Sequence, residues 1–547
     1  MAGPKAAPSL GRFDYIVVGA GSAGSALAEK LSRNPAIRVA VVEAGGTDRR
    51  FFVQMPLGYG KTFYDRRLNW GYRAEPDPGL AGQSDYWPRG KVIGGSGSIN
   101  AMVWIRGAAA DYDDWAAEGN PGWAFRDVLP TFKEIEDSEA GEDEWRGRGG
   151  PIHITDPSDM LHPLTQRFIR AGVEAGFRYN DDFNGPSQEG IGIYQINTKG
   201  GWRCSSARAF LWPAMRRPNL ALFARTMVTR LILKDGRVTG IAVIRQGSDA
   251  IIEASGEVIL AAGAVNTPHL LQLSGIGRGE DLKVAGLPIV HESPAVGHHL
   301  QDHLGINYSY RAKGESLNAQ LRSFWGKLAV GTDFLLRGGG PLSLSLNQGG
   351  GFVKSRPGLE RPNIQLYLQA ISTFTGKVGT RPLLTPDPFP GFNLGLSSCR
   401  PTSRGTILAR SPDPFEAPAI RPNAFGTEED RRDMLEGVKL LRRIAAQPAL
   451  AAIIEEELAP GPKISGDEEL MEDYRRRSGT VYHACGTARM GPDPARAVVD
   501  SRLKVHGLQG LRVADASVFP SVISGNTNAA AIMIGARAGD LILADRP

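Results

Sequence analysis

The chain is poor in cysteine and has no long apolar run. Its 547 residues include three cysteines, Cys204, Cys399 and Cys485, and none belongs to a C-x-x-C pair. This odd, sparse count argues against a disulfide scaffold and against a structural zinc site. No stretch of about 18 apolar residues occurs, so a membrane-spanning helix is not expected. The N-terminal stretch also lacks an apolar segment before Phe13, so we expect no signal peptide and a cytoplasmic, reducing location.

A strong excess of charge of one sign is also missing. The formal net charge is +5, and the densest basic clusters are Arg475–Arg477 and Arg442–Arg443. Because no basic tract is interleaved with aromatic residues, a nucleic-acid partner is not expected. A hydrophobic content of 41% and a charged content of 22% are typical of a globular protein, and the length predicts two to four folding units.

Glycine, in contrast, is abundant and is concentrated in short motifs. The apolar run Tyr15–Val18 predicts a buried parallel strand, and GAGSAG follows it directly. Gly19, Gly21 and Gly24 there form G-x-G-x-x-G. The first glycine permits a tight turn, the second lets the backbone approach a pyrophosphate, and the third lets a helix pack close to the strand. This pattern predicts a dinucleotide site at a helix N-terminus.

An acidic residue completes the dinucleotide fingerprint. Val39–Val42 predicts a second buried strand, and Glu43 ends it. In that position Glu43 can accept hydrogen bonds from both ribose hydroxyls, and its charge repels a 2′-phosphate, which argues against NADP. The strand–turn–helix–strand context makes a glycine-rich turn without a ligand a poor alternative. This strand–turn–helix–strand unit does not by itself distinguish an FAD site from an NAD site.

The residue pattern of the remaining chain changes near Leu220. Residues 1–12 are expected to be a flexible tail, and residues 164–176 an amphipathic helix. From Leu220 the pattern predicts a β-meander with a hairpin turn at Asp235-Gly236. Residues 303–480 are mixed and rich in proline-containing loops, and their motifs predict no specific chemistry.

Further motifs resemble the signatures of the glucose–methanol–choline (GMC) oxidoreductase family. They are PRGKVIGGSGSINAMVWIRG (88–107), GAVNTPHLLQLSGIG (263–277), VYHACGTARMG (481–491) and GLRVADASVFPSVISGNTNAAAIMIG (510–535). They occur in the family's order, and within the family the chain is most similar to the choline-dehydrogenase and primary-alcohol-oxidase branch. The resemblance implies an FAD-dependent enzyme that oxidises a small-molecule alcohol to an aldehyde or ketone and passes the electrons to oxygen or a quinone-type acceptor.

The resemblance also implies a two-part architecture of α/β plus α+β class. A Rossmann-like FAD-binding domain is expected from residues 1–155, 200–302 and 481–547. An α+β substrate-binding domain on an antiparallel sheet is expected from residues 156–199 and 303–480. The alcohol itself is not predicted, because its binding wall falls in the segment without motifs.

The fingerprint and the resemblance together assign a set of residues to FAD binding. These are Gly19, Gly21, Ser22, Ala23, Gly24, Glu43, Ala44, Val92, Gly95, Ser96, Asn100, Ala101, Met102, Val103, Val228, Asp515, Ala516, Thr527 and Asn528. Backbone N–H groups of the loop Gly94–Ser98 can meet the pyrophosphate or the flavin ring, the alternative being a solvent-exposed turn. Some family members attach FAD through a histidine whose position here is Ile99, which implies non-covalent FAD.

Two residues are predicted to carry the chemistry. Alcohol oxidation needs a base for the hydroxyl proton, and a neutral histidine suits this at physiological pH. By resemblance, His483 in YHACGT is the catalytic histidine, and Asn526 in GNTNA is its partner, which orients the alcohol and hydrogen-bonds the alkoxide. The alternatives are a buried structural histidine and a helix N-cap.

Other clusters and functions compete with this interpretation. Cys485, near His483, suggests a thiol nucleophile, but no third group accompanies it, so we expect a small buried thiol. His298, His299 and His303 have a spacing that a metal ion could use. The family has a similar stretch, usually with Asn in place of His299, and it implies no metal. A non-catalytic flavin protein and an NAD-linked reductase are the competing functions.

Overall fold

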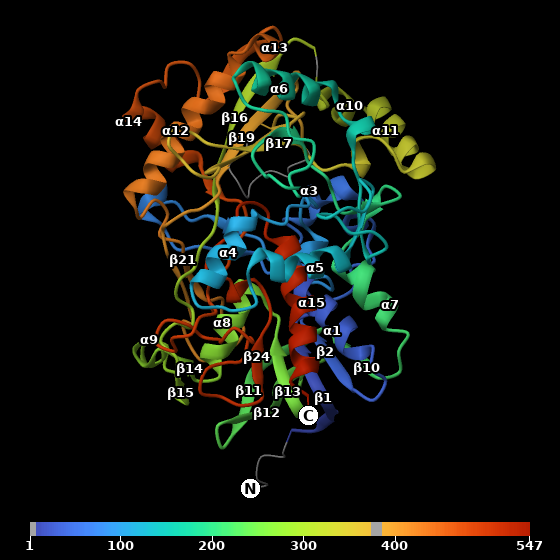
Figure 1. The fold of residues 1–547 in the computed structure, drawn as a ribbon, viewed down its shortest axis with the longest axis vertical. Helices are drawn as coiled ribbons and strands as arrows, with labels where there is room; N and C mark the ends of the chain where they lie inside the picture. The colour runs from blue at the N-terminus through green and yellow to red at the C-terminus, as the bar shows by residue number, and fades with distance from the viewer. Residues whose placement is uncertain (1–6, 315, 374–384, 547) are drawn as a thin grey trace.

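The computed structural model describes residues 7–314, 316–373 and 385–546. This part of the chain contains two seven-stranded sheets, surrounded by helices and by short two-stranded pairs. Figure 1 shows the first sheet in the lower half of the molecule, near both termini, and the second in the upper half. The architecture is therefore mixed, with helices and more than one sheet.

The first sheet combines parallel strands with a meander. Its order is β10-β2-β1-β13-β12-β11. Strand β24 also pairs with β13, on the edge opposite β1. The strands are β1 (Ser9–Val18), β2 (Val39–Glu43), β10 (Leu220–Ala224), β11 (Thr226–Lys234), β12 (Arg237–Arg245), β13 (Ser248–Leu260) and β24 (Leu511–Val513). The pairs among β10, β2, β1, β13 and β24 are parallel, while β11 to β13 form an antiparallel meander.

The predicted hairpin turn is confirmed, and the predicted tail is wrong in part. Asp235 and Gly236 have φ values of 49° and 74°, the left-handed backbone that a tight hairpin requires. Strand β1, however, begins at Ser9, which pairs with Ile251 of β13. Residues 9–12 lack an apolar pattern because they are at most half-buried. They are strand because the long strand β13 offers them backbone partners.

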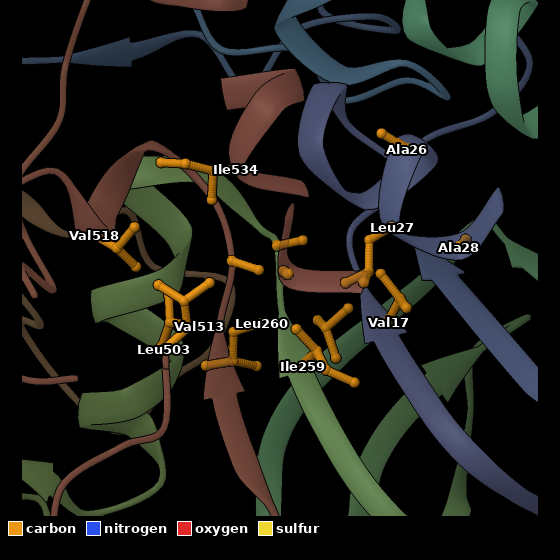
Figure 2. Close-up of a cluster of buried hydrophobic side chains, with 14 of the residues drawn as sticks. Val17, Ala26, Leu27, Ala28, Ile259, Leu260, Leu503, Val513, Val518 and Ile534 are labelled. Carbon is orange, nitrogen blue, oxygen red and sulfur yellow. The ribbon is translucent and has the colours of Figure 1, made fainter. Parts of the chain in front are cut away.

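Apolar side chains of β1, β13 and β24 form the core beneath the first sheet. Figure 2 shows Val17, Ile259 and Val513 in one buried cluster with Leu27 of α1 (Ser22–Ser32) and Ile534 of α15 (Asn528–Ala544). Burying side chains of this size contributes about 1.5–3 kcal/mol each. This core fixes the N-termini of α1 and α15 against the carboxyl ends of the parallel strands.

The second sheet is antiparallel and has the order β22-β16-β19-β18-β17-β7, with β23 paired to β16. Its strands are β7 (Gly190–Ile193), β16 (Leu304–Ala312), β17 (Asn347–Val353), β18 (Ile364–Gln369), β19 (Gly391–Ser398), β22 (Ile454–Ala459) and β23 (Gly479–Thr480). One face packs against α6 (Pro163–Glu174) and α12 (Glu428–Ala445), which lie at the top of Figure 1. The predicted amphipathic helix at 164–176 is confirmed as α6. The other face is left for a cavity.

The other elements surround these two sheets. Further helices are α2 (Phe51–Gln54), α3 (Tyr59–Thr62), α4 (Ala109–Ala117), α5 (Phe125–Ile135), α7 (Trp212–Ala214), α8 (Gly263–Leu273), α9 (Gly279–Val284), α10 (Asn318–Arg322), α11 (Phe324–Arg337), α13 (Pro448–Ala451) and α14 (Asp467–Arg477). Short strands pair as β3 (Tyr72–Arg73) with β4 (Tyr86–Trp87), β5 (Glu136–Ser138) with β6 (Ile152–Ile154), β8 (Thr198–Lys199) with β9 (Trp202–Arg203), β14 (Ile276–Gly277) with β15 (His291–Glu292), and β20 (Thr406–Leu408) with β21 (Ala419–Arg421). In the segments that the structure describes, every helix is too short or too polar to cross a bilayer.

Candidate active site

A single large cavity of about 1300 Å³ contains nearly all of the predicted site residues. It is lined by the turn after β1, by the end of β2, by the loop 95–103, by the second sheet and by the N-terminus of α15. Every residue assigned above to FAD or to catalysis lines it except Gly24 and Val92. Gly24 lies behind the cavity wall, where a Cβ would overlap the carbonyl oxygen of Gly19. Val92 is buried and forms a β-bridge with Gly46.

The two glycine motifs meet backbone to backbone at one end of the cavity. Gly95 has a φ of +57°, and a Cβ added to it would lie 2.7 Å from the Cα of Gly21. A side chain at either position would fill the space that the backbone leaves open. Gly97 and Ser98 are buried, so the alternative of a solvent-exposed turn for Gly94–Ser98 is wrong. This cradle beside the N-terminus of α1 fits a pyrophosphate.

Glu43 lies at the same end, on the last residue of β2. Its Oε2 accepts a hydrogen bond from the backbone N–H of Ala20 (3.0 Å), and its Oε1 accepts one from Gly45 (2.7 Å). Burial raises the pKa of Glu43 to about 7, against these two hydrogen bonds, which lower it. The two backbone donors orient the carboxylate at the cavity wall, and each oxygen keeps a further lone pair for a ribose hydroxyl.

Asp515 joins three segments where they meet the cavity. Its Oδ2 accepts hydrogen bonds from the Gly263 N–H (2.8 Å) and the Thr267 hydroxyl (2.6 Å), and its Oδ1 accepts one from the Ser517 N–H (2.8 Å). Burial raises the pKa of Asp515. The carboxylate therefore ties the start of α8 to the turn that follows β24, in addition to lining the cavity.

Arg203 is a buried cation that the sequence motifs do not reveal. Its guanidinium donates to the Oδ1 (2.7 Å) and the backbone oxygen (2.8 Å) of Asn100, and to the backbone oxygen of Gly97 (3.2 Å). Burial lowers the pKa of Arg203 to about 9. These hydrogen bonds hold the loop 97–100 in position against the cavity.

His483 and His303 form a hydrogen-bonded pair, and the partners of each ring determine its tautomer. The Nε2 of His303 lies 2.9 Å from the carbonyl oxygen of Cys399 and must donate, since a carbonyl only accepts. In a neutral imidazole the other nitrogen then carries a lone pair. The His303 Nδ1 lies 2.9 Å from the Nδ1 of His483, so His483 donates through Nδ1–H. The Nε2 of His483 is left unprotonated and faces Asn526 in the cavity.

Both histidines are held in the neutral form. Burial lowers the pKa of His303 to about 4. The pKa of His483 lies well below its ordinary value, first because of burial and then because His303 and Arg89 lie nearby. At neutral pH the His483 ring is therefore a proton acceptor and not a donor at Nε2.

Asn526 faces the unprotonated nitrogen of His483. Its Nδ2 lies 3.2 Å from the Nε2 of His483, and its Oδ1 accepts a hydrogen bond from the Nε2 of Gln365 (3.1 Å) on β18. Helix α15 begins at Asn528 with Thr527 at its N-cap position, so the N-cap alternative for Asn526 is wrong. The side chain instead connects the second sheet to His483.

Asp302 supports His483 through its backbone. The Asp302 Oδ1 accepts a hydrogen bond from the backbone N–H of His483 (2.7 Å), and Asp302 also accepts one from the hydroxyl of Thr480. Burial raises the pKa of Asp302 to about 7. The sequence did not predict these roles for Asp302, His303 or Gln365. Of the three, only His303 belongs to the histidine spacing that suggests a metal ion; Asp302 precedes it in the chain without a predicted role, and Gln365 lies in a segment without any motif.

The other clusters do not converge on the cavity. The Nε2 of His298 lies 2.8 Å from Asp281, whereas His303 contacts His483 and Cys399. Among the described residues, no group of three His, Cys, Asp or Glu side chains is placed to hold a metal ion. Burial raises the pKa of the Cys485 thiol, which disfavours the thiolate that a nucleophile needs.

Comparison with known proteins identifies the family. Models described as GMC oxidoreductase match residues 13–305 and residues 401–535. The chain is 40% identical to an alcohol dehydrogenase [acceptor] of Pseudomonas putida, over 97% of this chain and 96% of that protein. It is also 40% identical to an oxygen-dependent choline dehydrogenase of Rhizobium etli, over 98% of this chain and 96% of that protein.

A solved structure agrees with both relatives. Pyridoxine 4-oxidase from Mesorbium loti superposes with a TM-score of 0.89 at 30% sequence identity, covering 98% of this chain and 100% of that one. The glycine cradle, the acid at the end of β2 and the histidine–asparagine pair thus lie in a chain whose matches extend over nearly its full length. The chain belongs to the GMC oxidoreductase family and is an FAD-dependent oxidoreductase acting on CH–OH donors.

Proposed function

We propose that this enzyme oxidises an alcohol to an aldehyde or ketone, with His483 as the general base and with FAD bound non-covalently. The observation that carries the proposal is the pairing of an unprotonated histidine nitrogen with an amide donor, in the same cavity as the dinucleotide cradle. Bound FAD supplies the hydride acceptor, N5 of its isoalloxazine ring. Ile99, at the cavity wall, offers no atom for a covalent bond to the cofactor.

His483 would take the hydroxyl proton of the alcohol. Its Nδ1–H is committed to His303, so the lone pair of Nε2 points to where an alcohol oxygen can lie near Asn526. Because the enclosed ring is neutral, it needs no prior deprotonation at physiological pH. A positioned base of this kind contributes typically 10²–10⁴-fold to the rate. The alcohol loses this proton and a hydride and leaves as the carbonyl product.

Asn526 would stabilise the negative charge that develops on the alcohol oxygen. An alcohol that donates its hydroxyl proton to the single lone pair of the His483 Nε2 would replace the Asn526 Nδ2 there, and the two hydrogens of Nδ2 would then be available to the alcohol oxygen. Gln365 donates to the Asn526 Oδ1 and so fixes which side of the amide faces His483. A preorganised donor costs no reorganisation when the charge appears, which is the source of its catalytic effect.

The proposal divides the chain by task. Residues 1–155, 200–302 and 481–547 would hold FAD, and residues 156–199 and 303–480 would shape the alcohol site. Supporting this division, the cradle and Glu43 come from β1, β2, the turns that follow them and the loop at Gly95, all within residues 1–155, while β16 to β19, within residues 303–480, line another part of the cavity. Oxygen or a quinone-type compound would reoxidise the cofactor, and the cytoplasm is the proposed location.

An anaerobic spectrum tests this function. The purified protein should show flavin absorbance, and an alcohol should bleach it without oxygen. Readmitting air or adding a dye then identifies the acceptor. Acid precipitation should release the yellow colour into the supernatant if the cofactor is non-covalent. A flavin spectrum that no alcohol bleaches would favour a non-catalytic flavin protein, and colour retained in the pellet would refute non-covalent binding.

A further inference from the structure

The face of the second sheet that lines the cavity carries a continuous row of uncharged polar side chains. Ser309, Asn393, Gln369 and Asn347 are direct cross-strand partners on β16, β19, β18 and β17, and all four line the cavity. We call these four residues the polar row. Side chains directly opposite one another on neighbouring strands point to the same face of a sheet. The row therefore forms a strip across four strands.

Hydrogen bonds link the polar row into a single chain. Ser309 donates to the Oδ1 of Asn393 (2.8 Å), and the Nδ2 of Asn393 donates to the Oε1 of Gln369 (3.1 Å). The Nε2 of Gln369 donates to the Oδ1 of Asn347 (3.0 Å). Each bond uses one hydrogen and one lone pair, so each amide keeps a second hydrogen and a second lone pair. The row is thus fixed in orientation and still has hydrogen-bonding capacity to offer.

The polar row lies a fixed distance along β18 from the place where the alcohol would react. Gln365, which holds Asn526, is on the same strand as Gln369. Four residues along a strand span about 13 Å. Between them Tyr367 lines the cavity and donates through its hydroxyl to Gln365 (2.9 Å). A substrate that extends from His483 to the polar row therefore passes polar groups along its length.

The charges around the cavity disfavour a cationic substrate. Among the described lining residues, the acidic ones are Glu43, Asp85 and Asp515. Each already accepts two or more hydrogen bonds from the chain, in the case of Asp85 from the N–H groups of Tyr86 (2.8 Å) and Thr480 (2.6 Å). The lining also includes the cations Arg73, Arg89, Arg476 and Arg477, of which Arg476 and Arg477 are paired with Glu472 and Asp473. The guanidinium groups of Arg73 and Arg89 would repel an ammonium group.

We propose, resting on the proposed function, that the alcohol is uncharged and carries several further hydroxyl groups along an extended chain that reaches the polar row, as a linear polyol does. An apolar chain in the same place would leave the enclosed amides without partners. A site built to hydrogen-bond its substrate discriminates strongly against an analogue that lacks those groups. A quaternary ammonium alcohol lacks these hydroxyls, and its positive charge would meet the guanidinium groups of Arg73 and Arg89 in the same cavity.

A matched panel of alcohols tests this substrate class. Sorbitol and 1-hexanol have the same number of carbons, and choline adds the cationic case. Anaerobic flavin reduction by the holoenzyme should give a kcat/KM for sorbitol at least roughly tenfold above those for 1-hexanol and choline. Faster reduction by 1-hexanol or by choline would overturn the inference and leave the alcohol oxidation intact. If no alcohol bleaches the flavin, the proposed function itself fails.

A pair of variants on neighbouring positions separates binding from folding. Gln369→Leu should lower the ratio of kcat/KM for sorbitol over 1-hexanol roughly 10- to 100-fold, chiefly through KM. Gln348→Leu is the control, because Gln348 lies on the opposite face of the sheet, where its Oε1 accepts from the backbone of His162 (3.0 Å) and from Thr165 (3.3 Å). It should lower Tm and leave the ratio unchanged. An unchanged ratio in Gln369→Leu, or an equal loss in Gln348→Leu, would refute the role of the polar row.

Discussion

The two sheets meet the same cavity with different kinds of surface. The first sheet and the loop at Gly95 present backbone, because a Cβ at Gly19 or Gly95 would collide with backbone atoms and Gly21 has no side chain where it meets Gly95. The second sheet presents side chains, since the polar row and Gln365 on its strands carry the hydrogen bonds. A backbone surface suits a constant ligand such as a pyrophosphate. A side-chain surface can be altered one residue at a time and so suits a ligand that differs between relatives.

The largest effect should come from the residue between these two surfaces. His483→Ala removes the proposed base, and the rate of anaerobic flavin reduction by an alcohol should fall roughly 10²–10⁴-fold. The FAD content should stay unchanged, because the cradle is built from other residues. Stopped-flow absorbance at matched FAD content measures the rate.

Asn526→Ala provides the comparison, because Asn526 contacts both His483 and Gln365 of the second sheet. Asn526→Ala should cost less, since it removes one neutral hydrogen-bond donor while the base remains. If both side chains act on the same alcohol oxygen, the double variant should lose less than the product of the two single losses. Near-wild-type reduction in His483→Ala would remove His483 from the mechanism.

A smaller effect should follow from the tautomer that His303 imposes. His303→Leu removes the acceptor for the His483 Nδ1–H, so the rate of flavin reduction should fall roughly 10- to 100-fold, the equivalent of about 1.4–2.8 kcal/mol. His303→Gln keeps both an acceptor and a donor and should restore most of the rate. Equal losses in the two variants would indicate that His303 only fills space.

Glu43 tests the other surface. Glu43→Ala removes the carboxylate placed for the ribose hydroxyls, so the Kd for FAD should rise about tenfold, the equivalent of about 1.4 kcal/mol. Equilibrium titration of the apoprotein with FAD measures this. Glu253, an exposed acid on β13 of the same sheet, gives the control, because Glu253→Ala should leave the Kd unchanged. An unchanged Kd in Glu43→Ala would show that the ribose contact lies elsewhere.

The smallest expected effect concerns pH. The base must be neutral to accept a proton, and burial holds the pKa of His483 well below its ordinary value. The rate of flavin reduction should therefore change less than about twofold between pH 8 and pH 6 and decline only at lower pH, where the ring becomes protonated. This limb should be absent in His483→Ala. A decline centred at the ordinary histidine pKa in the wild type would contradict an enclosed, neutral ring.

The cofactor end of the cavity could be predicted from the sequence because backbone geometry restricts which residues fit. A side chain at Gly19 or Gly24 would collide with carbonyl groups, so the motif that avoids these collisions is recognisable in any chain that uses it. The same holds for the hairpin at Asp235-Gly236, where both residues have positive φ. Such positions are informative without a structure.

The substrate end could not be predicted, because its contacts connect residues far apart in the chain. His303 and His483 are 180 positions apart, and Gln365 and Asn526 are 161 apart. Each is an ordinary residue in its local context, and only the pairing of β16 to β19 brings the polar row together. The strand at residues 9–12 is not predictable for a related reason, since its partner lies on β13, more than 200 residues away in the chain: Ser9 pairs with Ile251.

One comparison tests most directly whether the first surface binds the cofactor and the second end of the cavity carries out the reaction. Glu43→Ala and His483→Ala are each saturated with FAD, and their anaerobic reduction by the same alcohol is measured beside the wild type. Saturated Glu43→Ala should be reduced at close to the wild-type rate, while saturated His483→Ala should be slower by roughly 10²–10⁴-fold. Slow flavin reduction in Glu43→Ala at full FAD occupancy, or fast reduction in His483→Ala, would contradict the assignment of cofactor binding to Glu43 and of proton removal to His483.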